Sequence, residues 1–119
     1  MTNHKEKEKE EEEKGLFAHS IIFRFHESVS YAEGGIVSKQ IIRKENGNIT
    51  LFAFDTEEGL SEHTSPFDAL IQVIEGKARI TIGGKAFILE AGDSIIMPAD
   101  IPHAVFALKK FKMILTMIR

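Results

Sequence analysis

The sequence predicts an all-β domain, a small antiparallel barrel or jelly roll, on the basis of three observations. Short apolar segments of β-type composition follow one another from about residue 36 to the C-terminus. Gly, Asn and Pro separate these segments at intervals of roughly 8–12 residues. No internal window holds a long helical period, and only residues 27–33 suggest a short helical turn. This pattern is typical of a sandwich or a closed barrel, and closure removes exposed sheet edges.

The individual strands are predicted from their composition and from the turns between them. The Asn46-Gly47 pair and the Gly83-Gly84 pair each lie between two apolar segments and indicate tight hairpins. Further turns are expected at residues 91–93 and 98–102. The predicted strands are residues 36–43, 49–55, 70–74, 78–82, 86–89, 94–97, 103–108 and 112–118.

Residues 1–15 differ from the rest of the chain. The run from Lys5 to Lys14 contains four Lys and six Glu and no apolar residue. Alternating charges can support pairs along a helix, but this run has no apolar face that could dock on a core. We therefore expect a charged, disordered tail over residues 1–15 and a single barrel domain over residues 16–119.

Composition excludes several classes of function. The formal charge is −3, and the chain after the tail is close to neutral and shows no basic face, so a nucleic-acid partner has little support. The chain has no cysteine, which excludes disulfides, thiolate metal sites and a cysteine nucleophile. No stretch approaches the roughly 18 apolar residues that span a bilayer. We expect a cytoplasmic protein without a membrane partner.

His63 and His103 are the candidate functional residues. Each lies beside a predicted strand, and each has a proline nearby. Forty residues separate them, so helical spacing is not involved, but two strands of a barrel could bring both rings into one interior. Imidazole binds zinc, iron, nickel and copper, and it also transfers protons. A histidine beside an apolar strand is also often a structural residue, so these alternatives stay open at this point.

Residues 59–107 resemble the two motifs of the cupin superfamily, in its small single-domain, RmlC-like form. Fifteen residues separate the two motifs, which is a typical short spacing. The resemblance implies a double-stranded β-helix, or jelly-roll barrel. The matching positions are His63 and Gly76 in the first motif, and Gly92, Pro98 and His103 in the second.

The departures from the motifs fall mainly on the metal ligands. Ser65 stands where the second histidine belongs, and Ala69 stands where a Glu, or sometimes Gln or His, belongs. Asp100 and Ala107 replace the glycine and the asparagine of the second motif. Gly59 lies two residues from the position of the first motif's opening glycine. Of four usual ligands, only the two histidines remain.

The resemblance therefore implies a divalent transition metal (Zn, Fe, Mn or Ni) held weakly by His63 and His103, because catalytic sites usually supply three protein ligands. Asp68 is one residue out of register, which on a strand turns it to the opposite face. Candidate substitute ligands are Asp68, Glu62, Ser65 through a water, and His26.

The family register also predicts a ligand pocket in the barrel interior. It would be mostly apolar, with two imidazoles and one hydroxyl, and would suit a small, partly apolar ligand with a polar or anionic group. The alternative is that these side chains simply fill the core. The predicted lining residues are His63, Ser65, Ala69, Ile71, His103, Val105, Phe52 and Phe54.

Two main classes of function follow from these expectations. The first is a small-molecule-binding module without catalysis, such as a sensor or carrier. The second is a metal-dependent enzyme, an oxygenase or isomerase of the kind that cupins often are, using His63 and His103. A metal-free acid–base role for the pair is a narrower option, and catalytic residues are not identified. The resemblance also implies a homodimer, because small cupins commonly pair through the faces of their outer strands. The outward-facing residues here include Leu70 and Ile74, which need cover.

Overall fold

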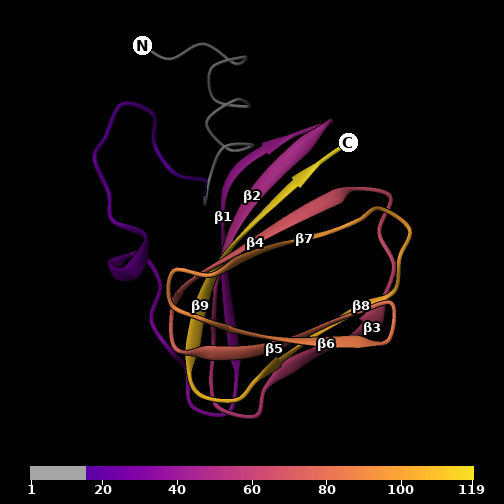
Figure 1. Cartoon of the computed structure of the whole chain (residues 1–119). Coiled ribbons are helices and arrows are strands. Elements are labelled where there is room, and N and C mark those ends of the chain that lie inside the picture. The colour runs from indigo at the N-terminus through magenta and orange to yellow at the C-terminus, as the bar shows by residue number, and fades with distance from the viewer. Residues whose placement is uncertain (1–15) are drawn as a thin grey trace, which may run out of the picture.

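The computed structural model describes residues 16–119; the predicted tail at residues 1–15 lies outside them. Two antiparallel sheets face each other (Figure 1). One has five strands in the order β1-β2-β9-β4-β7, and the other has four in the order β3-β8-β5-β6. The all-β prediction is confirmed. The elements are a 3₁₀ turn η1 (Phe25–Glu27) and strands β1 (Ile36–Lys44), β2 (Gly47–Phe54), β3 (Gly59–His63), β4 (Asp68–Glu75), β5 (Lys77–Ile82), β6 (Lys85–Glu90), β7 (Ser94–Met97), β8 (His103–Ala107) and β9 (Phe111–Ile118).

Two of the turns between strands follow the glycine pattern of the sequence. Gly83 and Gly84 link β5 to β6 with φ angles of +56° and +82°, which a two-residue turn of the I′ type requires. Gly76, between β4 and β5, has φ +86°, and a Cβ there would collide with the carbonyl oxygen of Lys110. Only glycine fits this backbone path, which explains the glycine at the end of the first motif.

The prediction of a helical turn over residues 27–33 was wrong. The turn lies earlier, at Phe25–Glu27, and ends where the Ser28 hydroxyl donates a hydrogen bond to the Arg24 carbonyl over 2.6 Å. Beyond it Val29 is buried and Tyr31 is half-buried. Burial of every second residue is typical of an extended segment that lies on a surface. Contact with the sheet therefore favours an extended conformation here over a helical turn. Among residues 16–119, no helix is long and apolar enough to cross a membrane.

The main core lies between the two sheets. Alternate residues of each strand point inward, and the ring of Phe54 stacks on Phe111 with centroids 4.5 Å apart. These side chains exclude water from most of the space between the sheets. The buried members of this core are Phe54, Ala69, Ile71, Val73, Ala78, Ile80, Leu89, Met97, Val105, Ala107, Phe111 and Met113.

A second core covers part of the outer face of the five-stranded sheet. The N-terminal segment, residues 16–31, runs along the outside of this sheet (Figure 1). Val29 packs there against Ile41, Leu51 and Ile114, with Ile74 beside them. Ile74 is therefore covered by the N-terminal segment of its own chain, and it does not need a second copy of the protein to cover it.

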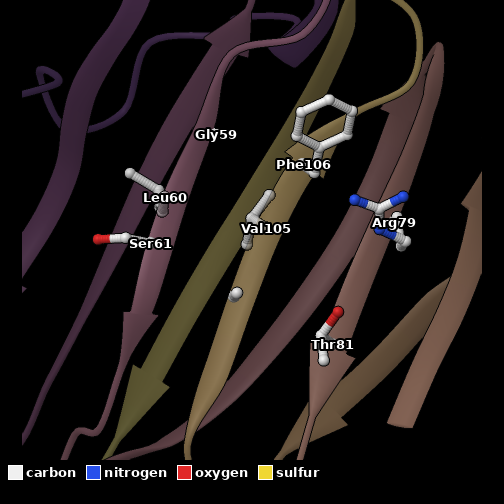
Figure 2. Close-up of a pocket in the computed structure, with 8 residues that line it drawn as sticks. Gly59, Leu60, Ser61, Arg79, Thr81, Val105 and Phe106 are labelled. Carbon is white, nitrogen blue, oxygen red and sulfur yellow. The ribbon is translucent and has the colours of Figure 1, made fainter. Parts of the chain in front are cut away.

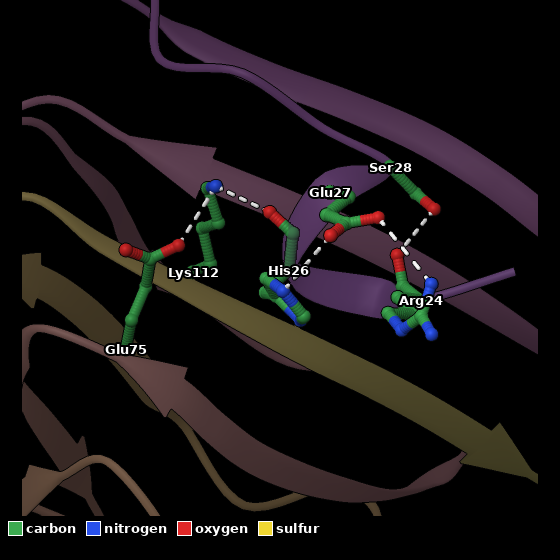
Figure 3. Close-up of polar contacts among 6 residues, drawn as sticks. All are labelled: Arg24, His26, Glu27, Ser28, Glu75 and Lys112. Carbon is green, nitrogen blue, oxygen red and sulfur yellow. Dashed lines mark hydrogen bonds and ion pairs between the residues drawn. The ribbon is translucent and has the colours of Figure 1, made fainter.

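A buried lysine ties the N-terminal segment to the sheet. Lys112 is 8% exposed, and its Nζ donates to Oε1 of Glu75 and to the carbonyl oxygen of His26, both at 2.7 Å (Figure 3). The same ammonium lies 5.0 Å from the centre of the Tyr31 ring. Burial raises the pKa of Tyr31 to about 12, and the nearby Glu75 carboxylate adds to the rise.

Candidate functional site

The antiparallel pairing of β3 and β8 places His63 opposite His103 at one end of the barrel. The two Nε2 atoms are 3.1 Å apart. The ring centroids are 4.3 Å apart and the ring planes cross at 71°. The structure therefore brings together the two histidines that the sequence analysis singled out.

Backbone carbonyls fix the orientation of both rings. The Nδ1 atom of His63 lies 2.7 Å from the carbonyl oxygen of Ser61, and Nδ1 of His103 lies 3.1 Å from that of Ile101. A carbonyl oxygen only accepts, so each Nδ1 carries a hydrogen and each neutral ring has a bare lone pair on Nε2. Two lone pairs then face each other. A proton, a metal ion or a ligand donor placed near both nitrogens would relieve their repulsion.

The two rings differ in exposure. His103 is 5% exposed, whereas His63 is exposed. Burial lowers the pKa of His103 from its ordinary 6.5; the Ile101 carbonyl partly offsets this and the neighbouring His63 adds to it. The pair thus combines a buried ring, which resists protonation, with a ring that solvent can reach.

The inner wall next to the pair is apolar. Ala69, at the position of the family's acidic ligand, is 2% exposed and pairs with Met97 on one side and Met117 on the other. Ile82 pairs with His103 across the second sheet. The sequence analysis did not assign these residues to the site. The strand register places Ile82 beside His103, and it places Met97 and Met117 beside Ala69.

Ser65 lies in the loop between β3 and β4, and it is half-buried. Its hydroxyl oxygen accepts a hydrogen bond from the amide of Phe67 over 3.2 Å. The Oγ atom therefore supports the turn that leads into β4. Its own hydrogen is still available to a ligand.

Ile71 and Val105, also predicted to line the pocket, belong to the main core. Ile71 has no exposed surface and Val105 is 4% exposed. A side chain without accessible surface borders no space that would hold a water molecule. Ile71 is therefore a packing residue in this conformation, as the core-filling alternative expected.

Phe52 and Phe54 point inward but lie away from the histidines. Their partners on β9 come four and six residues before the partner of Ala69. At about 3.3 Å per residue, this puts the two rings roughly 13 and 20 Å further along the barrel. Phe54 is fully buried and stacks on Phe111, and Phe52 is half-buried. The structure does not bring these two residues to the pair.

The two histidines fit two corners of a metal site. Nitrogens bound to one ion at about 2.0–2.1 Å stand about 3.0–3.4 Å apart when they occupy neighbouring positions. The Nδ1 bonds to carbonyls are the outer-shell contacts that metal-binding histidines usually make. Within residues 16–119, however, no three His, Cys, Asp or Glu side chains are arranged so that they could hold one metal ion. The protein donors alone therefore fall short of a usual set.

The substitute ligands suggested by the sequence have other roles or positions. Asp68 is exposed, and its Oδ1 accepts a hydrogen bond from the amide of Ala99 over 2.9 Å. It lies next to Ile118 in the register, on the outward face. His26 lies on the outer face of the five-stranded sheet and contacts Glu27. Glu62 is exposed.

Comparisons with known proteins place this architecture in a family. The model of the cupin domain family matches residues 50–119. No curated protein matches the chain. Among solved structures, a conserved protein of unknown function from Streptococcus pyogenes is 29% identical, with a TM-score of 0.83, and the alignment covers 87% of this chain and 90% of that one.

Two further solved structures support the same assignment. A cupin 2 conserved barrel domain protein from Leptotrichia buccalis is 40% identical over 82% of this chain, with a TM-score of 0.78, and the alignment spans 47% of that protein. A cupin superfamily protein from Desulfitobacterium hafniense is 24% identical, with a TM-score of 0.78, over 87% of this chain and 94% of that one. Its identity is low enough that it supports the fold alone. The chain belongs to the cupin domain family and forms the double-stranded β-helix fold.

Proposed function

We propose that this cupin domain binds a small molecule in the barrel interior, at the end where His63 and His103 meet. The observation that carries the proposal is the orientation of the pair. In each ring the Nδ1 atom is bonded to a backbone carbonyl, and the two Nε2 atoms lie 3.1 Å apart. Of the two rings, that of His63 is exposed to solvent. A polar group of a ligand placed near both nitrogens would satisfy two acceptors at once.

The surroundings favour a ligand that is partly apolar. Ile82, which pairs with His103, carries no charge, and neither do Ala69 and Met97 on the inner face of the other sheet. A pocket with apolar walls and a few convergent polar groups is the usual form of a small-molecule site. The ligand class is accordingly a small, partly apolar molecule with one polar or anionic group. The proposed setting is the cytoplasm, because the chain contains no cysteine that an oxidising compartment could pair.

The test compares the native protein with His63→Ala, with His19→Ala as a matched control. Both histidines are exposed, and only His63 belongs to the pair. Mass spectrometry under native conditions, followed by solvent extraction, should find an organic molecule that His63→Ala loses and His19→Ala keeps. If none co-purifies, a library of small acids, alcohols and amides should contain compounds that raise the melting temperature of the native protein and not of His63→Ala. Failure of both searches would reject the proposal.

A metal-dependent activity of the oxygenase or isomerase kind is the second candidate, favoured by the 3.1 Å separation of the two nitrogens. A bound divalent metal would supply Lewis acidity, and His63 and His103 would hold it. Two neutral imidazoles bring no negative charge, so water or a ligand must complete the shell and affinity should be low. Elemental analysis after loading with zinc, iron, manganese or nickel tests this. Near-stoichiometric metal that His63→Ala and His103→Ala both lose would support it, whereas no retained metal would reject it.

We also propose that two copies pair through the outer face of the five-stranded sheet. A cross-strand row on this face consists of apolar residues and one threonine, and it contains no charge. Ile96 and Ile42 at its ends are 64% and 42% exposed, and Ile118 beside it is 62% exposed. A self-complementary apolar row suits a two-fold symmetric contact. The row consists of Ile42, Ile49, Thr116, Leu70 and Ile96.

A further inference from the structure

The four-stranded sheet has a hollow of about 260 Å³ on its outer face (Figure 2). It lies over β3, β8 and β5, on the side of these strands that faces away from the barrel interior. The side chains of Arg79, Thr81, Ala104 and Phe106 point outward, because the alternate residues of the same strands, such as Ile80, Val105 and Ala107, belong to the core. The lining residues are Gly59, Leu60, Ser61, Arg79, Thr81, Ala104, Val105 and Phe106.

Small residues on neighbouring strands create the hollow. Ala104 on β8 pairs with Thr81 on β5, and Gly59 on β3 pairs with Phe106 on β8. A side chain at Gly59 would collide with the carbonyl oxygen of Val105, so the close approach of β3 to β8 requires glycine there. The floor is therefore largely backbone and methyl groups. The larger side chains of Phe106 and Arg79 stand at its edge (Figure 2).

Arg79 is held in a fixed position at this edge. It pairs with Phe106 across the strands, and its Cζ atom lies 4.8 Å from the centre of the Phe106 ring. Stacking on an aromatic face holds the guanidinium plane while leaving its N–H groups free to donate. Thr81 projects from the same side of β5, two residues further along. A guanidinium fork and a hydroxyl thus border one small hollow.

The charge of the hollow is unbalanced. Its lining contains one arginine and no Asp or Glu. None of the ion pairs formed within residues 16–119 includes Arg79, while the nearby Lys77 is paired with Glu90 at 3.6 Å. A guanidinium has five donors and no acceptor, and its planar fork matches a carboxylate. The complementary ligand is an anion with planar geometry.

We infer that this hollow is a second binding site, for a small planar monocarboxylate such as an aromatic acid. The carboxylate accepts two hydrogen bonds from Arg79, and the Thr81 hydroxyl donates a third. The apolar part of the ligand lies over Ala104 against the edge of the Phe106 ring. The volume is just below the usual range of about 300–1,000 Å³ for ligand pockets, which limits the occupant to a small molecule. This site is distinct from the histidine pair, because it lies on the outer face of β3 and β8, whereas His103 is on the inner face of the same sheet.

Benzoate is the probe, and amide chemical shifts of the full chain in an NMR titration are the readout. The expected result is a saturable shift at Ser61, Arg79, Thr81 and Phe106. Benzamide, which has the same shape without the charge, should bind about tenfold or more weakly because the charge-assisted bonds are lost. Inorganic phosphate tests whether any anion suffices, and binding as tight as that of benzoate would overturn the planar monocarboxylate assignment.

Variants test whether Arg79 binds the carboxylate of benzoate. Arg79→Gln should weaken benzoate binding about tenfold or more, and Arg79→Lys should recover only part of it because an ammonium lacks the fork. Arg43→Gln is the matched control, since Arg43 is also exposed on a strand but lies on the other sheet. His63→Ala should still bind benzoate, as judged from the shifts of Thr81 and Phe106, because this variant loses the hydrogen bond to Ser61 and the Ser61 amide is then not a clean reporter. Shifts that centre on His103, that persist in Arg79→Gln, or that do not saturate would overturn the inference.

Discussion

The amide of Asp100 donates a hydrogen bond of 2.8 Å to the carbonyl oxygen of Ser65. This bond joins the loop after β3 to the loop before β8, and these loops adjoin the strand ends that carry the two histidines. Asp100 makes the bond with φ +65°, in the left-handed region that disfavours most side chains. The second cupin motif has glycine at this position, so the chain retains the backbone shape without the residue that adopts it most easily.

Asp100→Gly should therefore stabilise the protein by about 0.5–1 kcal/mol, because glycine adopts this φ without steric cost. Urea unfolding at neutral pH measures the change. Asp100→Ala is the matched control and should lose stability, because alanine keeps the Cβ and lacks the local hydrogen bonding that helps aspartate tolerate the conformation. An Asp100→Gly variant less stable than the native protein would contradict this account of the loop.

The burial of His103 makes a prediction for acid stability. Its folded-state pKa lies below the ordinary 6.5, so the unfolded chain binds a proton more readily than the folded one. The part of the free energy of unfolding that depends on the neutral His103 ring is fully present above about pH 6.5. It is lost as the pH falls from about 6.5 through the lowered pKa of the folded state. His103→Asn should remove this part of the pH dependence. The free energy of unfolding at several pH values between about 5 and 8, with a chelator present, provides the measurement.

The control for that experiment is His19→Asn, because His19 is exposed and far from the pair in the sequence. It should keep the native pH profile. If the profile of His103→Asn also matched that of the native protein between pH 5 and 8, burial of this ring would not be a source of the acid sensitivity.

Most strands were predictable because they alternate between a buried and an exposed face. β5 shows this pattern clearly, with Ala78 and Ile80 in the main core and Arg79 exposed between them. In β4 the buried residues Ala69, Ile71 and Val73 also alternate, although its outward positions include the apolar Leu70 and Ile74. β3 was not predicted, since it has little alternation: four of its five residues are exposed, and only Leu60 is half-buried. Pairing with β8 defines this strand, and such long-range pairing leaves no local pattern of composition.

The candidate site was predictable only where the cupin motifs carry it. The register of the motifs brings His63 and His103 together, although their spacing alone leaves this open. Phe52 and Phe54 were placed on the correct inner face but at the wrong level, because the offset of β2 against β9 sets that level. The hollow beside Arg79 needs the alignment of three strands, so no local feature of the sequence indicated it.

Lys112 should be the residue that fixes the N-terminal segment. Lys112→Met keeps the length of the side chain but leaves the His26 carbonyl and the Glu75 carboxylate without their donor. Glu75 is partly exposed and can turn to water, so we expect a loss of about 1–3 kcal/mol rather than the larger cost of an isolated buried charge. Hydrogen exchange of the Glu27 and Ser28 amides should become faster than in Lys39→Met, an exposed lysine on β1. Unchanged exchange at these two amides would show that apolar packing alone holds the segment.

The proposed dimer predicts that the same substitution has different effects on dimerisation on the two sheets. Ile96 and Ile88 are both exposed isoleucines, at 64% and 52%, but Ile96 ends the apolar row on the five-stranded sheet and Ile88 lies on the four-stranded sheet. Ile96→Lys puts a charge into the apolar contact, where it would lose its hydration without gaining a partner. Light scattering coupled to size exclusion should find twice the chain mass for the native protein and for Ile88→Lys, and a shift towards single chain mass for Ile96→Lys. A native protein of single chain mass, or dissociation caused by Ile88→Lys and not by Ile96→Lys, would rule out this face as the interface.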